Sequence, residues 1–254
     1  MNSAQTYDDL SEHYHLMFED WNASIERQAS VLSSILQKNC GLAKSARVLD
    51  CTCGIGTQAL GLAKLGFQVS GCDISSNAIK RAQQEAAQRH LDIQFSVGNI
   101  LALNDFQGPP FDAVICMDNS LPHLESAEQL AQTTQQMRAK LNLKGVLMAS
   151  IRDYDRLLME KPIIQGPSFY GTQGSRRIVF QLWDWIDDRR YVFHLYVTRE
   201  TESGWQTFHT SGIYRAVLRE EISSALRDAD FSNVRWLFPE ESGFYQPIVL
   251  GVAN

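Results

Sequence analysis

The sequence predicts one α/β domain built around a doubly wound, mostly parallel sheet. Short apolar runs alternate with helical stretches from residue 46 to residue 151, which is typical of parallel strands joined by crossover helices. Three long segments rich in β-branched and aromatic residues follow Pro162 and predict an antiparallel insertion. The 254 residues, 44% of them hydrophobic, suffice for a single large core. We divide this single domain (1–254) into N-terminal cap helices at 1–45, a core at 46–152 and 216–254, and an antiparallel β insertion at 153–215.

The N-terminal part has helical periodicity. Between Tyr7 and Leu36 the apolar residues recur at the spacing of one face of an amphipathic helix. The pattern is interrupted near residues 20–23, so we expect two helices separated by this break.

The central part alternates between short strands and helices after Gly41. Consecutive units of this kind form right-handed crossovers, and their helices cover both faces of a parallel sheet. We expect strands at 46–50, 67–72, 92–97, 111–117 and 144–151, and helices at 57–65, 76–89 and 125–141.

The insertion begins after a segment rich in glycine and proline, "IIQGPSFYGTQGS". The next three segments are "RRIVFQLWDWI", "DDRRYVFHLYVTRE" and "GWQTFHTSGIYRAV", and turn signals separate them. This pattern predicts an antiparallel meander. The chain then returns to the core with a helix at 218–228 and strands near 231–237 and 246–252.

Charge and cysteine content disfavour several classes of protein. A formal net charge of −6 without clustered Lys and Arg argues against a nucleic-acid partner, because phosphates require such clusters. No basic and apolar leader and no apolar run of about 18 residues occurs, so we expect a cytoplasmic protein that does not bind a membrane. The five cysteines are expected to be reduced. Because Cys51 and Cys53 lack the second ligand pair of a zinc site, we predict no metal.

The stretch "ARVLDCTCGIGTQALGLAKLGFQVSGCDIS" predicts a cofactor site. A strand runs into Gly54 and Gly56 and then a helix, which places backbone N–H groups and a helix N-terminus beside a ligand. Asp73 closes the second strand about twenty residues later, where a carboxylate accepts hydrogen bonds from ribose hydroxyls. These features fit either a nicotinamide dinucleotide or S-adenosylmethionine.

Asp50 favours the second of these cofactors. It stands at the tip of the first strand, where a pyrophosphate would bring a like charge into a poorly solvated crevice. S-adenosylmethionine has no phosphate, and a carboxylate stabilises its ammonium and sulfonium groups. We therefore favour S-adenosylmethionine over a nicotinamide cofactor.

Four passages resemble the motifs of class I S-adenosylmethionine-dependent methyltransferases. "VLDCTCGIGT" resembles their D-x-x-x-G-x-G motif, "GCDIS" their second-strand acid, "VGNI" the third-strand motif and "FDAVICMDNSLPHL" the fourth-strand segment. The resemblance implies a Rossmann-like fold, S-adenosylmethionine as methyl donor and S-adenosylhomocysteine as product. Asn99 stands where the family often has an acid, and its amide oxygen can accept the same hydrogen bond from adenine. The resemblance assigns cofactor binding to Asp50, Gly54, Gly56, Asp73, Ile74, Asn99, Ile100, Met117 and Asn119.

Other passages are similar to the glycine and sarcosine N-methyltransferase branch of that family. They are "YHLMFEDWNASIERQ", "DNSLPHL", "IRDYDRLL" and the C-terminal segment from "YRAVLREE" to "QPIVLG". This resemblance implies a helical cap over the cofactor that includes Tyr14, Trp21 and Arg27. Ordinary helix packing is the alternative for Tyr14 and Trp21.

Arg152 is the candidate for binding the methyl acceptor. In "IRDYD" it follows a strand at the carboxyl edge of the sheet, where a guanidinium can hold a carboxylate through two hydrogen bonds. The alternative is a surface salt bridge with Asp153 or Asp155. The family segment usually reads Arg-Asn-Tyr-Asp, so Asp153 replaces an amide here. We assign the substrate site to Asn119, Arg152, Tyr154 and Arg177. We expect the core at 46–152 and 216–254 to bind the cofactor and the β insertion at 153–215 to form part of the substrate site.

The predicted chemistry requires few catalytic groups. Methyl transfer is an in-line displacement that depends on proximity, alignment and exclusion of water. The attacking amine must be neutral, and His123 is a candidate base, with a packing or capping role as the alternative.

The sequence therefore predicts an S-adenosylmethionine-dependent methyltransferase of a small-molecule amine, with glycine or sarcosine as the first choice. We expect a monomer or a small homo-oligomer. The alternatives are a methyltransferase of an amino-sugar amine or of a carboxylate, a non-catalytic S-adenosylmethionine-binding protein, and a nicotinamide-dependent dehydrogenase.

Overall fold

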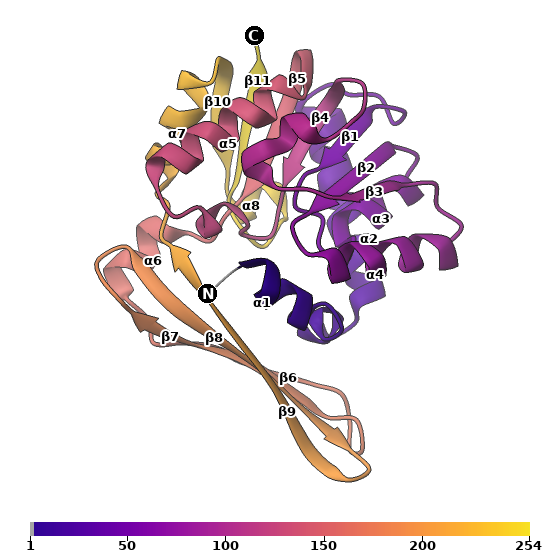
Figure 1. Cartoon of the computed structure of the whole chain (residues 1–254), viewed down its shortest axis with the longest axis vertical. Coiled ribbons are helices and arrows are strands. Elements are labelled where there is room, and N and C mark those ends of the chain that lie inside the picture. Colours follow the sequence, from indigo (N-terminus) through magenta and orange to yellow (C-terminus); the bar gives the residue numbers. More distant parts are fainter. Residues whose placement is uncertain (1–2) are drawn as a thin grey trace.

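The computed structural model describes residues 3–254 and contains two sheets (Figure 1). The larger sheet has seven strands in the order β10-β11-β5-β4-β1-β2-β3, and the smaller has four in the order β6-β7-β8-β9. In the large sheet, β11 is antiparallel to both of its neighbours, and the remaining pairs are parallel. The predicted doubly wound, mostly parallel fold is thus confirmed. Its strands are β1 (Arg47–Asp50), β2 (Gln68–Asp73), β3 (Gln94–Val97), β4 (Phe111–Cys116), β5 (Leu141–Ser150), β10 (Phe231–Leu237) and β11 (Ile248–Ala253).

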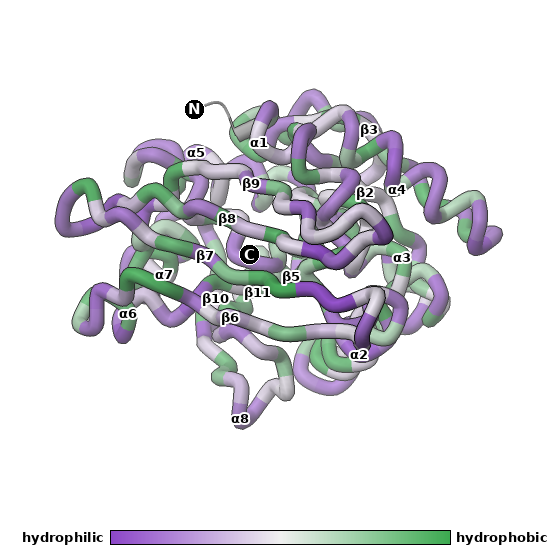
Figure 2. Tube along the Cα trace, turned by 90° about the horizontal axis from the view of Figure 1, so that it is seen from below, coloured by the Kyte–Doolittle hydropathy of each residue, from purple (hydrophilic) through white to green (hydrophobic). Residues whose placement is uncertain are grey.

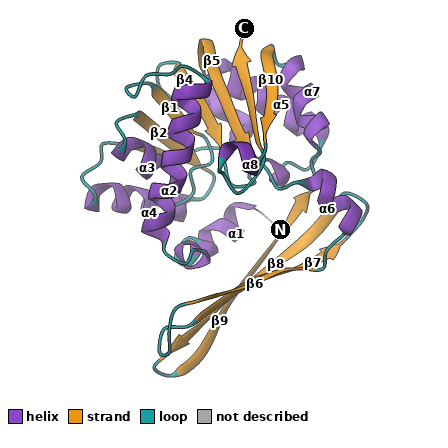
Figure 3. Cartoon of the chain, turned by 180° about the vertical axis from the view of Figure 1, so that it is seen from behind, coloured by secondary structure: helices purple, strands orange, loops and turns teal. Residues whose placement is uncertain are grey.

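Helices cover both faces of the large sheet, as Figures 1 and 3 show from opposite sides. The helices are α1 (Ser3–Leu10), α2 (Trp21–Ser34), α3 (Thr57–Lys64), α4 (Ser76–Gln88), α5 (Ala127–Ala139), α6 (Tyr154–Glu160), α7 (Arg219–Asp228) and α8 (Pro239–Ser242). The α2, α3 and α4 side shares a core with Val48 and Ile115, and the α5 and α7 side shares one with Leu49 and Val114. Neighbouring strand residues point to opposite faces, so burial on both faces explains the continuous apolar runs. No helix among residues 3–254 is long and apolar enough to cross a membrane.

The small sheet is antiparallel and has one more strand than the sequence predicted. Its strands are β6 (Ile164–Tyr170), β7 (Arg177–Trp185), β8 (Arg190–Thr201) and β9 (Gly204–Arg215). The missed strand, β6, comes from the segment rich in glycine and proline. It pairs with β7 alone. An edge strand tolerates Pro167 because one side of its backbone needs no sheet partner.

Two further details differ from the predicted elements. The break between the first helices covers residues 11–20 and contains a 3₁₀ turn at Tyr14–Met17, so it begins earlier than expected. Helix α6 follows directly after Arg152, where no helix was predicted. Asp153 caps this helix by accepting a hydrogen bond from the backbone N–H of Arg156.

The small sheet lies across the carboxyl ends of the central strands (Figure 2). Its inner face carries buried aromatic residues, including Trp183, Tyr191 and Phe193, that belong to the same apolar cluster as the α5 and α7 side of the core. Helix α1 lies between the two sheets (Figure 1). The small sheet and α1 therefore cover the carboxyl edge of the large sheet, which is the edge where open α/β sheets bind ligands.

Helix α1 is held at this edge from two sides. Asp8 accepts hydrogen bonds from the Oγ of Ser75, at 2.6 Å, and from the backbone N–H of Asn77, at 3.0 Å. Arg81 of α4 donates to the carbonyl of Ser11 at 2.7 Å. On the other side, Thr6 donates to the carbonyl of Ser211 in β9 at 3.0 Å.

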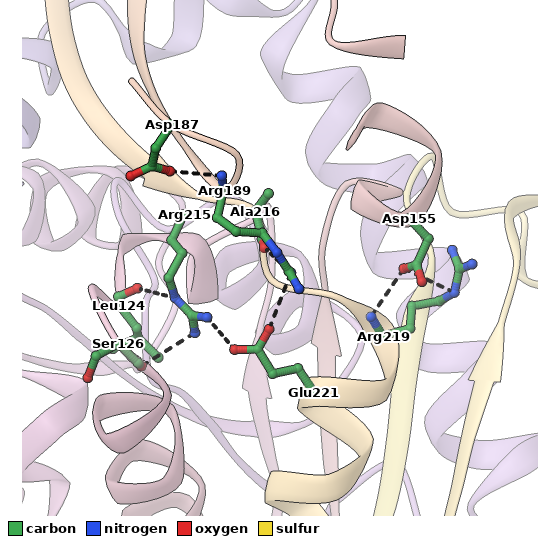
Figure 4. Close-up of polar contacts among 9 residues, drawn as sticks. All are labelled: Leu124, Ser126, Asp155, Asp187, Arg189, Arg215, Ala216, Arg219 and Glu221. Carbon is green, nitrogen blue, oxygen red and sulfur yellow. Dashed lines mark hydrogen bonds and ion pairs between the residues drawn. The ribbon is translucent and has the colours of Figure 1, made fainter. Parts of the chain in front are cut away.

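Polar contacts also join the small sheet to the core (Figure 4). Arg215, at the end of β9, donates to the carbonyl of Leu124 at 3.1 Å and pairs with Glu221 of α7. Arg219 lies 3.5 Å from the carboxylate of Asp155 in α6. These contacts fix the orientation of the small sheet against the carboxyl edge.

Candidate active site

Two adjoining cavities lie between the large sheet, α1 and the small sheet. The first cavity, of about 260 Å³, is lined mainly by the loops that follow β1 to β4. The second cavity, of about 630 Å³, extends toward α6 and the small sheet. Tyr7, Tyr14 and Asp118 line both cavities and so form their common wall.

The turn after β1 needs its two glycines for different reasons. Gly54 has φ +51°, lines the first cavity, and has open space where a Cβ would stand. A ligand can therefore approach the backbone closely there. Gly56 has φ +94°, and its Cβ would meet Leu60 of α3 at 3.2 Å. Gly56 does not line the first cavity, so it shapes the turn and permits the helix to pack.

Asp73, at the end of β2, points its carboxylate into the first cavity. One oxygen accepts a hydrogen bond from the backbone N–H of Gly54 and the other from that of Ser75, each at 2.9 Å. Burial raises the pKa of Asp73, although these backbone donors offset part of the rise. Each oxygen keeps a free lone pair, so the fixed carboxylate can accept hydrogen bonds from both hydroxyls of a ribose.

Asp50 lies behind the cavity wall instead of on it. It is fully buried, and neither carboxylate oxygen has a hydrogen-bond partner. Burial raises its pKa to about 8, and the nearby N–H groups of Thr52 and Ala59 offset this only in part. The carboxyl group is therefore mostly protonated at pH 7. A cation bound beyond Cys51 and Thr52, which form the surface above Asp50, would favour its ionised form.

Three of the predicted cofactor-binding residues come from the loops after β2 and β3. Ile74, Asn99 and Ile100 all line the first cavity. The amide oxygen of Asn99 accepts a hydrogen bond from the backbone N–H of Leu101 at 2.9 Å, which leaves one lone pair for a ligand. Met117 is buried beneath this region and lies outside the lining of the first cavity.

The charges of the first cavity suit a cationic ligand. Asp73, Asp118 and Glu125 line it, and no Lys or Arg is among the described residues that do so. A pyrophosphate would face only like charges there, whereas a sulfonium and an ammonium group would be stabilised. The cavity therefore fits S-adenosylmethionine better than a dinucleotide.

The three predicted cap residues lie in different environments. Tyr14 faces both cavities. Trp21 is buried, and its indole N–H donates to the hydroxyl of Thr57 at 2.9 Å, so it packs α2 onto α3. Arg27 donates to Ser24 at 3.1 Å and borders a separate pocket of about 220 Å³. Trp21 and Arg27 lie outside the two main cavities within the described part of the chain.

Arg152 lines the second cavity and has only neutral partners. Its guanidinium donates to the hydroxyl of Tyr191 and to the amide oxygen of Gln181, each at 3.2 Å. It also lies over the Trp183 ring, 4.9 Å from the centroid. Among residues 3–254 no carboxylate lies within 4.0 Å of it.

The salt bridge considered as the alternative for Arg152 does not form. Asp153 and Asp155 instead pair with Arg219. A half-buried guanidinium without a counter-charge attracts an anion, so the second cavity offers a site for a carboxylate.

Of the other predicted substrate residues, Asn119 and Tyr154 support Arg152, whereas Arg177 lies outside the described linings of both cavities. Asn119 accepts a hydrogen bond from the backbone N–H of Arg152 at 3.0 Å and donates to the hydroxyl of Tyr154 at 3.1 Å. Asn119 lines the second cavity, not the first, and Tyr154 is fully buried. Arg177 donates to the carbonyl of Phe18 at 2.6 Å and so anchors the N-terminal segment.

His123 borders the first cavity at the end of a 3₁₀ turn. Its Nε2 lies 2.8 Å from the hydroxyl of Tyr7, and its ring contacts Tyr214, with 4.6 Å between centroids. Burial lowers its pKa to about 4, so the imidazole is neutral at pH 7. It stays a candidate base, although a group of such low pKa accepts a proton from an ammonium only weakly.

Three residues of the common wall and its surroundings were not predicted from the sequence: Tyr7, Asp118 and Tyr245. Asp118 carried a local signal, because an acid directly after a parallel strand lies at the ligand-binding edge. Tyr7 and Tyr245 carried none, since they reach the site from opposite ends of the chain.

Comparisons with known proteins find a methyltransferase domain in this chain. Residues 48–145 match a family described as a methyltransferase domain. A glycine/sarcosine N-methyltransferase of Parasynechococcus marenigrum is 34% identical over 140 residues, which are 55% of this chain and 48% of that protein. The matched part thus spans about half the length of this curated relative.

Solved structures show the same fold at low sequence identity. DesVI of Streptomyces venezuelae has a TM-score of 0.76 and 18% identity, covering 100% of this chain and 99% of its own. CalS10, an amino pentose methyltransferase of Micromonospora echinaspora solved with S-adenosylmethionine bound, has a TM-score of 0.73 and 18% identity, covering 95% and 94%. Residues 48–145 therefore form a methyltransferase domain, and the chain has the fold of S-adenosylmethionine-dependent methyltransferases.

Proposed function

We propose that this protein transfers a methyl group from S-adenosylmethionine to the amine of a small amino acid, with glycine or sarcosine as the preferred acceptor. The observation that carries this proposal is Arg152, a guanidinium without a counter-charge in the second cavity. That cavity shares a wall with the acid-lined first cavity. A carboxylate on Arg152 would direct the amine of the same molecule toward this wall.

The residues of the first cavity would hold the methyl donor. Asp73 would accept hydrogen bonds from the ribose, Gly54 would let the ligand approach the backbone, and Asn99 would accept a hydrogen bond from adenine. When bound, S-adenosylmethionine supplies an electrophilic methyl carbon on its sulfonium. The acids around it stabilise the positive charge of the bound state.

The second cavity would align the acceptor. Arg152 binds the carboxylate through two hydrogen bonds, and Asn119 holds the backbone of Arg152 in place. Tyr14 and the small sheet keep water from the reacting atoms. Proximity and alignment of this kind supply much of the rate acceleration in an in-line displacement.

A turnover assay with purified protein tests this proposal. We expect glycine and sarcosine to be methylated in the presence of S-adenosylmethionine, with mass spectrometry detecting the methylated amine and the product S-adenosylhomocysteine. Methylamine, which lacks a carboxylate, should be a poor acceptor. Equal turnover of methylamine and glycine would contradict the role of Arg152.

The size of the second cavity favours one further candidate acceptor. At about 630 Å³ it exceeds the space that glycine fills, and Gln165, Glu160 and Glu240 add polar groups to its lining. CalS10, of similar fold, is an amino pentose methyltransferase by name. An amino sugar therefore belongs in the same assay, and turnover of an amino sugar without turnover of glycine would select this second candidate.

A further inference from the structure

Asp118 lies at the junction of the two cavities, directly after β4. It has φ +58° and is followed by Asn119 at φ +67°. Asp and Asn adopt this left-handed backbone more readily than other residues with side chains. The two positive φ values turn the chain so that Asp118 lines both cavities while Asn119 lines the second.

A buried polar network holds the Asp118 carboxylate in place. Gln58 of α3 donates to its Oδ2 at 2.7 Å and also to the amide oxygen of Gln28 in α2 at 2.8 Å. Tyr245 donates its hydroxyl to the Oδ1 of Asp118. The backbone N–H of Asp118 donates to Ser150 at 2.9 Å. Two distant segments thus donate to the carboxylate itself, while Gln28 orients Gln58 and Ser150 holds the backbone of Asp118.

None of the hydrogen-bond partners of Asp118 is charged. In the described part of the chain no Lys, Arg or His lies within 4.0 Å of the Asp118 carboxylate. Burial raises the pKa of Asp118 above its usual value, which brings it nearer to that of an amine. A half-buried carboxylate with free lone pairs and only neutral donors is stabilised by a cation.

The second cavity has few other acids that could bind a cation. Asp153 pairs with Arg219, and Glu160 pairs with Arg156. Glu240 is exposed at the rim. Within the described lining of the second cavity, Asp118 is therefore the half-buried acid without a basic partner.

We propose that Asp118 binds the ammonium group of the methyl acceptor and takes its proton. This inference rests on the proposed function, and it extends recognition from one end of the acceptor to both, with the carboxylate on Arg152 and the amine on Asp118. In the step, the N–H proton moves to the carboxylate and the freed lone pair of nitrogen forms the bond to the methyl carbon. The carbon–sulfur bond breaks, its electron pair stays on sulfur, and the carboxyl group later releases the proton to water.

Binding to the protein loaded with S-adenosylhomocysteine tests the inference without turnover. Calorimetry compares glycine with glycolate, in which a hydroxyl replaces the amine. Asp118→Asn, which suits the left-handed backbone, should weaken glycine binding at least tenfold and glycolate binding less than twofold. Arg152→Ala should weaken both ligands at least tenfold. Tyr245→Phe, which removes one donor to Asp118, should weaken glycine binding about threefold.

Asp92→Asn, an exposed acid in the loop before β3, is the matched control and should change none of these affinities. Thermal unfolding checks that each variant is folded. If Asp118→Asn weakens the binding of glycine and of glycolate equally, the inference is overturned. It is also overturned if the variant loses more affinity for S-adenosylmethionine than for glycine. If the wild type binds methylammonium or an amino sugar but not glycine, the amino-acid proposal fails while Asp118 is still tested with those amines. Unchanged binding of every amine in Asp118→Asn would overturn the inference alone.

Discussion

The first and second cavities are assembled from very different lengths of chain. Apart from Tyr7 and Tyr14, the first cavity is lined by residues between 51 and 129, which come from the carboxyl ends of neighbouring parallel strands and from the loops and first helical turns that follow them. The lining of the second cavity extends from Tyr7 to Pro247 and includes the small sheet. The backbone arrangement of a parallel sheet is thus enough to form the first cavity, because neighbouring strands end at the same edge. The second cavity depends on how segments distant in sequence pack together.

The two cavities also differ in the charged residues that line them. The first has acids and no Lys or Arg among its described lining residues, whereas Arg152 and Arg156 line the second. In the proposed function, the acids of the first cavity would therefore favour the cationic donor, and Arg152 would favour the carboxylate of the acceptor. Mutations in one cavity should accordingly affect one ligand and leave the other unchanged.

The largest expected effect comes from Asp73→Ala in the first cavity. The ribose would lose a charged acceptor and the backbone N–H of Gly54 would lose its partner, so S-adenosylmethionine affinity should fall about a hundredfold. Calorimetry measures the affinity, with Asp92→Asn as the control. An affinity within threefold of the wild type would show that Asp73 does not bind the cofactor.

Arg152→Ala should give the next largest effect, confined to the second cavity. Loss of a charge-assisted hydrogen bond should raise the KM for glycine about ten- to a hundredfold and leave the KM for S-adenosylmethionine within about twofold. Arg152→Lys keeps the charge but loses the two-pronged geometry, so its effect should be intermediate. Steady-state kinetics with each substrate varied separately measures both constants. A similar rise in the KM for glycine and the KM for S-adenosylmethionine would contradict the assignment of the two substrates to separate cavities.

Asp50→Asn should show how much the buried acid beneath the first cavity lowers the free energy of unfolding. Because its pKa is about 8 in the folded protein and about 4 in an unfolded chain, folding favours the protonated form. The contribution of Asp50 to the free energy of unfolding of the wild type is thus largest below pH 4 and is lost as the pH rises toward 8. We expect the variant to match the wild type near pH 4 and to be more stable by up to about 4 kcal/mol at pH 7, which lies about three units above the pKa of the unfolded chain. Urea unfolding at several pH values measures this difference, and a pH-independent difference would contradict the raised pKa.

Arg177→Gln should have the smallest effect and should act on both cavities together. Arg177 anchors the segment that carries Tyr14, which lines both cavities. Loss of this hydrogen bond should raise the KM of both substrates about threefold. If only the KM for glycine rises, Arg177 contacts the acceptor, as its sequence position first indicated.

Local sequence patterns determined the parallel core and much of the first cavity. The spacing of Asp50, Gly54, Gly56 and Asp73 depends on one β-α-β unit, whose geometry allows few arrangements. The position of Arg152 was also predictable, because it follows a core strand directly. The edge strand β6 was missed since it pairs with β7 alone and therefore needs little of the usual strand pattern.

Only the tertiary structure decided which side chains reach the cavities. Trp21 bonds to Thr57, Asp50 lies beneath the cavity wall, and Tyr154 supports Asn119, although spacing alone could have placed each at a ligand. Tyr245 meets Asp118 across 127 positions of the chain. Periodicity determines the backbone of an element and the face that each residue occupies, because these depend on neighbours in sequence. The direction and partners of a side chain at the site depend on packing among distant segments, and a local pattern carries no record of that packing.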